Sequence, residues 1–246
     1  MLTRVEMKQR AREAMASATT HPILVGLIFT LLNSAIAFVL PFIMGMIMTA
    51  AGIGASITDP ENAELSSVLL ALPITALFSL IIGVLTSILM VGFFTYTLKT
   101  IRHQQAGIGT LFSYFSHFVK IFGLTFMISL FTTLWSLLFI IPGYIAMLRY
   151  SQAFMIFIDD PDKGIMQCIN ESKAMMSGHL WEYFVLQISF ILWELLSMVT
   201  CGIAMLYVQP YIYLTNSVYY DNLRYLTNPP QEDRNLDIPN IEVPIM

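Results

Sequence analysis

Residues 137–160 read LLFIIPGYIAMLRYSQAFMIFIDD. Two apolar runs flank the pair Pro142-Gly143, and the second run carries a single charge, Arg149. One helix over 119–158 would be about 60 Å long at about 1.5 Å per residue, which is twice the thickness of a bilayer's hydrocarbon core. Because a Pro-Gly pair marks a turn, the stretch predicts a helical hairpin that turns at Pro142-Gly143.

The composition places the chain among membrane proteins. Of its 246 residues, 57% are hydrophobic and 11% are charged, whereas soluble domains carry about 25% charged residues. The net charge of -4 gives no reason to expect a nucleic-acid partner. Four runs without Asp, Glu, Lys or Arg each exceed the roughly 20 residues of a transmembrane helix: 21–58, 65–98, 121–148 and 195–220.

The sequence predicts an all-α fold, a polytopic transmembrane helix bundle with six spans and short amphipathic interfacial helices. The bundle occupies 22–226, between an amphipathic interfacial helix over 1–21 and a flexible, Pro-rich cytoplasmic tail over 227–246. The predicted spans lie at about 22–49, 67–98, 119–141, 144–158, 181–200 and 203–220.

The distribution of Lys and Arg predicts the orientation. The loop over 51–64 has neither residue, so it is expected outside the cell. Six spans place both termini and every loop with Lys or Arg on the cytoplasmic side of a bacterial cell membrane. Four kinked spans are the alternative and would move Lys163 and Lys173 outside, so the charge bias favours six.

Short elements flank the spans. Near the N-terminus, Thr3 and Glu6 form a capping-box pattern, and Arg4, Lys8 and Arg12 repeat along one helical face. This row suits anionic lipid head groups; a solvated helix that obeys the positive-inside rule is the equal alternative. A second surface helix is predicted from an Asp160 N-cap to Gly178.

Two charges fall within predicted spans. A charge at bilayer depth costs at least roughly 2.5–3.5 kcal/mol, so it should find a partner. We expect Arg149 and Glu194 to approach each other, with Gln152 and Gln209 nearby, as a polar pathway or an anionic-ligand site. The alternative is that Arg149 extends to the interface while Glu194 is only hydrogen-bonded.

The sequence contains no recognisable catalytic constellation. Its four histidines and its cysteines Cys168 and Cys201 lack metal-ligand spacing, and no phosphate loop or nucleophile elbow occurs. No metal or cofactor is expected. The first hypothesis is a non-enzymatic membrane module whose partners are the bilayer, anionic lipids or other membrane proteins. The second is a small transporter or permeation pathway that uses Arg149 and Glu194.

Several motifs together resemble a known family. The chain resembles, over Leu2 to Tyr225, the family of uncharacterised bacterial integral membrane proteins catalogued as domain of unknown function 975. The resemblance implies a polytopic bacterial membrane protein and no particular activity; Glu194 departs from the family pattern. The motifs are Leu111-Phe112 with Phe115 and Phe118, Ile140-Ile141-Pro142-Gly143, Arg149-Tyr150-Ser151, Asp160-Pro161-Asp162, Ser172 with Met176 and Gly178, Ser189-Phe190-Ile191-Leu192-Trp193, and Pro210-Tyr211.

Overall fold

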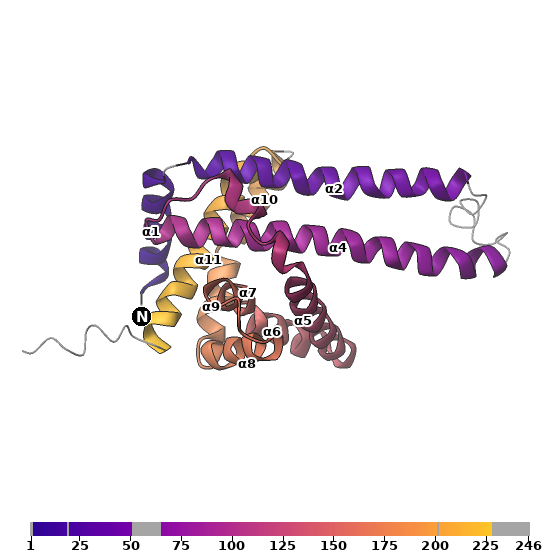
Figure 1. Ribbon diagram of the computed structural model, residues 1–246. Coiled ribbons are helices and arrows are strands. Elements are labelled where there is room, and N and C mark those ends of the chain that lie inside the picture. Colours follow the sequence, from indigo (N-terminus) through magenta and orange to yellow (C-terminus); the bar gives the residue numbers. More distant parts are fainter. Residues whose placement is uncertain (1, 19, 51–64, 201, 228–246) are drawn as a thin grey trace, which may run out of the picture.

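A computed structural model (Figure 1) describes residues 2–18, 20–50, 65–200 and 202–227, which form helices and contain no β-strand. The predicted loop at 51–64 and the tail from residue 228 lie outside the described residues. The elements are α1 (Arg4–Ser17), α2 (Pro22–Ala50), α4 (Leu65–Ile101), the 3₁₀ turns η1 (Ile108–Phe112) and η2 (Phe115–His117), α5 (Phe118–Leu138), α6 (Ile140–Tyr150), α7 (Ala153–Asp159), α8 (Ile165–Met176), α9 (Leu180–Ile188), α10 (Ile191–Val199) and α11 (Met205–Thr227).

The longest helices, α2 and α4, run side by side and project past the rest of the molecule (Figure 1). They contain 29 and 37 residues, or about 43 and 55 Å. Near the body they are joined by the stacked rings of Phe29 and Phe93, whose centroids lie 4.5 Å apart. Farther out, Met44 and Met48 pack with Ala71.

Helix α11 packs against the second half of α4 and runs in the same direction along the chain. The rings of Tyr213 and Phe93 contact each other, and the hydroxyls of Ser217 and Thr97, 120 residues apart, lie at 2.8 Å. The outer half of α4 extends beyond the other helices except α2, and there it packs against α2 (Figure 1).

The hairpin in the stretch 137–160 exists, but its turn lies three residues earlier than predicted. Phe139, in extended conformation, alone separates α5 from α6. Pro142 lies in the first turn of α6, where a missing N–H costs nothing. Gly143 packs on α5: a Cβ there would lie 2.7 Å from Cα of Ser136. The Pro-Gly pair thus starts the returning helix and brings it close to α5.

The prediction of six spans is not supported. Among the described residues, four segments are long and apolar enough to cross a membrane: Pro22–Ala50, Ala71–Ile101, Ile108–Leu138 and Leu180–Val199. The span predicted at 144–158 is divided between α6 and α7, of 11 and 7 residues, about 16 and 10 Å long. Its apolar run is continuous in sequence, but a turn at Ser151-Gln152 interrupts the helix. Helix α11, which contains the sixth predicted span, is long enough to cross a membrane but is too polar to qualify as a span.

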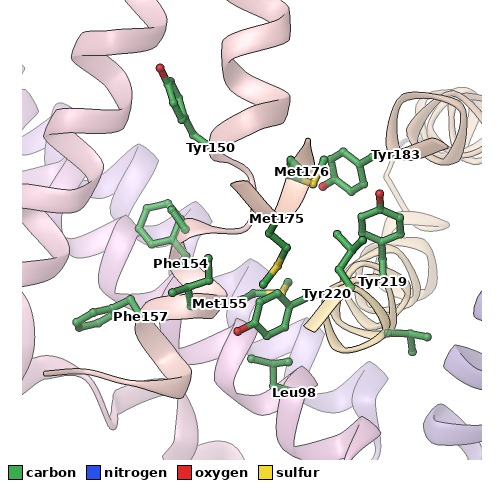
Figure 2. Close-up of a cluster of buried hydrophobic side chains, with 14 of the residues drawn as sticks. Leu98, Tyr150, Phe154, Met155, Phe157, Met175, Met176, Tyr183, Tyr219 and Tyr220 are labelled. Carbon is green, nitrogen blue, oxygen red and sulfur yellow. The ribbon is translucent and has the colours of Figure 1, made fainter. Parts of the chain in front are cut away.

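Helix α7 lies in the main core, and five of its seven residues are buried. The core around it combines aromatic rings with methionines of α8 (Figure 2). Tyr183 and Tyr219 face each other there, with ring centroids 4.9 Å apart. Rings supply large apolar area, and methionine fills the irregular space between short helices.

The predicted surface helices are present with shifted bounds. The capping box of α1 is confirmed, with Thr3 and Glu6 exchanging hydrogen bonds of 2.7 and 3.3 Å. Helix α1 packs against α4 and α11 and buries Met7 and Ala11. α8 begins at Ile165 rather than after Asp160, because 160–163 form a turn first.

Candidate functional site

Arg149 and Glu194 form no ion pair in the described part of the chain, although the sequence suggested that they would meet. Both side chains are exposed. Arg149 lies near the end of α6, where its backbone carbonyl accepts a hydrogen bond from Ser172. Glu194 lies in α10, and none of the described side chains pairs with its carboxylate.

Gln152 is buried at the break between α6 and α7. Its backbone N–H donates to the Ser172 hydroxyl at 3.2 Å, and its side-chain amide donates to Ser151 at 2.9 Å. The first of these bonds satisfies a backbone group freed by the helix break and ties the break to α8. No described residue donates a hydrogen bond to the side-chain oxygen Oε1 of Gln152.

Gln209 joins α11 to α2. Its Oε1 accepts a hydrogen bond of 2.8 Å from Thr30. Gln209 also lines a cavity of about 570 Å³ together with Glu194. Of the four residues predicted to share a site, the structure thus brings Glu194 and Gln209 to one cavity and places Gln152 in a separate hydrogen-bond network.

The sequence reading missed a cluster of charged residues, here called the Asp159 cluster. It consists of Arg102 after α4, Asp159 at the end of α7, and Tyr220, Asp221 and Arg224 on α11. Arg102 contacts Asp159 and Asp221 at 2.6 Å each, and it also donates to the second oxygen of Asp159 at 3.2 Å. Arg224 and the Tyr220 hydroxyl reach this second oxygen of Asp159, at 2.9 and 2.8 Å.

The Asp159 carboxyl is held in its ionised form. Burial opposes ionisation, but hydrogen bonds from Arg102 and Tyr220 and the charges of Arg102 and Arg224 outweigh it, so the pKa of Asp159 lies below its ordinary value. Its side chain is only 11% exposed. The cluster therefore fixes the ends of α4, α7 and α11 together through one buried carboxylate.

No local pattern could have revealed this cluster. Arg102 and Asp159 are 57 residues apart, and Arg102 and Asp221 are 119 apart. In sequence each is an ordinary charge beyond an apolar run. The only available signal was that all three follow such runs on the side predicted to be cytoplasmic.

The basic row of α1 lies partly on aromatic rings. Lys8 Nζ is 4.6 Å from the centroid of Phe190, and the Arg12 guanidinium carbon is 5.6 Å from that of Tyr211. Arg4 is exposed. None of the three pairs with a carboxylate of the described chain. Burial, then repulsion from Arg12 and Arg4, lowers the pKa of Lys8.

The described residues contain no group of three His, Cys, Asp or Glu side chains placed to hold a metal ion.

With the helix order and the polar contacts established, the chain can be compared with known proteins. Residues 137–227 match the family model described as protein of unknown function (DUF975). The match thus covers the end of α5 and all of α6 to α11. This is a shorter range than the expected Leu2 to Tyr225. No curated protein and no solved structure matches the chain.

Proposed function

We propose that this DUF975-like chain is a non-enzymatic, multi-pass module of the bacterial cell membrane, which interacts with lipids or other proteins through the basic row on α1. The observation that carries this proposal is the unneutralised basic row of Arg4, Lys8 and Arg12. The three cations repel one another, and none has a carboxylate partner among the described residues.

The contacts of the row favour lipids over a protein partner. Lys8 and Arg12 lie over rings at the α9–α10 junction and on α11, so the row follows the side of an apolar bundle. A cationic row beside apolar helices suits phospholipid head groups, with about 1 kcal/mol per Lys or Arg near an anionic surface. We therefore assign anionic lipids as its partner.

Lipid binding by purified protein tests this assignment. Native mass spectrometry would count bound phosphatidylglycerol and phosphatidylcholine for the wild type and for Arg4→Gln/Arg12→Gln. The double variant should lose phosphatidylglycerol selectively, by about 2 kcal/mol for two charges. Arg10→Gln is the matched control, since Arg10 is exposed on α1 outside the row. Equal losses in both variants would reject the row as a lipid site.

The second candidate function, a small transporter or permeation pathway, is favoured by the two cavities that meet at Glu194. Arg149 lines neither of them. A pathway would therefore use Glu194 with Gln209, and Arg149 would have no direct part in it.

A further inference from the structure

Glu194 is a carboxylate in apolar surroundings. It lies in α10, within a segment long and apolar enough to span a membrane, and its neighbours Leu192 and Leu195 are exposed. No described side chain donates a hydrogen bond or supplies a positive charge to it. A carboxylate at membrane depth without a partner costs several kcal/mol, so a partner from outside the chain would stabilise its ionised form.

Two cavities meet at this side chain. One, of about 490 Å³, lies between α4, α6 and α9; its lining is mostly apolar and includes the rings of Phe94, Tyr144, Tyr150 and Tyr183, with Ser151 and Gln187 as its uncharged polar side chains. The other, of about 570 Å³, lies between α10 and α11 and reaches Gln209 and Tyr213. Both volumes are in the range of small-molecule sites. Glu194 is the only charged residue among the described residues that line either cavity.

This lining selects one class of ligand. An anion would face the single negative charge, and a metal ion would lack the several oxygen ligands that it needs. A neutral lipid would leave the carboxylate unpaired. An organic cation with a large apolar body complements the whole lining. Its charge pairs with Glu194, its body fills the apolar space, and the faces of the aromatic rings attract the cation.

We propose that Glu194 and the two cavities form a binding site for a lipophilic organic cation. The ligand reaches the site from the lipid phase, because the rims carry exposed apolar side chains such as Met147, Ile191 and Met205. This proposal is independent of the anionic-lipid role of α1, which lies on different residues, so either can fail alone.

Equilibrium dialysis of the purified chain in a nonionic detergent tests the site. The probes are tetraphenylphosphonium and tetraphenylborate, which share size and shape and differ in the sign of their charge; detergent without protein gives the background. The wild type should bind the cation in preference to the anion. Glu194→Gln should raise the Kd for the cation by about tenfold or more and should not weaken anion binding.

Two further variants make the result specific. Glu182→Gln removes another carboxylate of the same segment, one that pairs with His179 and lines neither cavity, and should bind as the wild type does. Glu194→Asp keeps the charge and should retain more affinity than Glu194→Gln. Unchanged cation binding in Glu194→Gln, or equal binding of both probes by the wild type, would overturn the proposal. Gel filtration of each variant checks that it is folded.

Discussion

Asp159 shows how a single side chain can hold three helices. Its two oxygens receive Arg102, Arg224 and Tyr220, and Arg102 continues to Asp221. Removing one member of a buried charge pair leaves the other unpaired and costs about 3–5 kcal/mol. Arg224 is 48% exposed, and an exposed pair contributes about 1 kcal/mol or less. Arg102 therefore accounts for most of the attraction.

The lowered pKa of Asp159 predicts acid sensitivity. A carboxyl whose pKa is depressed in the folded state stabilises it fully above the ordinary value of about 3.9, and this stability is lost as the pH falls through the lower folded pKa. The melting temperature in detergent should therefore be unaffected by this group between pH 7 and pH 5, and should fall below about pH 4.

Asp159→Asn should be less stable at neutral pH and should lose less further stability in acid. Glu171→Gln is the control: it also removes a carboxylate from an ion pair, with Lys163, but from a more exposed position. If Asp159→Asn keeps the full acid slope of the wild type, the cluster is not its source.

At the scale of elements, Gly92 decides how the loop after α4 packs. The turn η1 lies directly on α4, and a Cβ at Gly92 would stand 2.6 Å from the carbonyl carbon of Leu111. Leu111 is fully buried. Only a glycine lets this backbone approach the helix so closely, because the neighbour is main chain and cannot rotate away.

Gly92→Ala should therefore destabilise the protein by about 2 kcal/mol or more, in the range of overpacked cores. Gly83→Ala, on the same helix with no atom within 4 Å of the added methyl group, should be neutral or stabilising by up to about 1 kcal/mol. Thermal unfolding of both variants in one detergent makes the comparison. Equal melting temperatures would show that η1 can shift away from α4.

The sequence anticipated these elements better than their contacts. Apolar runs predicted α2, α4 and α5, and the capping box predicted the start of α1, because such signals are local. The break at Ser151-Gln152 escaped notice because apolar side chains continue on both sides of it. Likewise Glu194 stood out as an intramembrane charge, while its cavities depend on how α6, α9 and α11 pack.

At the scale of the whole molecule, the chain returns repeatedly to one charged end. Lys120, near the start of α5, donates to the carbonyl of Pro161 just beyond α7, so this hairpin begins and ends at the same level. Tyr219 of α11 similarly bonds the His179 carbonyl before α9. The opposite tips are apolar and exposed, at Leu137 and Ile140 of one hairpin and Val199 and Ile203 of the other.

These features predict a labelling pattern in cells. In a version without native cysteines, Asn170→Cys, on the exposed polar face of α8, should react with a membrane-impermeant thiol reagent only after permeabilisation. Val199→Cys and Ile203→Cys should stay unlabelled from either side, because we expect these exposed apolar tips to lie in the bilayer. Labelling of Asn170→Cys in intact cells would contradict the predicted cytoplasmic position of α8. Labelling of Val199→Cys or Ile203→Cys would show that the tips lie in water.

The Asp159 cluster also has a consequence for how the protein is made. Translation runs from the N-terminus, so Arg102 leaves the ribosome long before Asp159, and Asp221 follows 119 residues after Arg102. Until α11 arrives, the arginine and the aspartate must meet without their remaining partners. Helix α11 is therefore the closing piece of assembly, and a nascent chain halted before Asp221 would present an incomplete charge cluster to the cell's quality-control machinery.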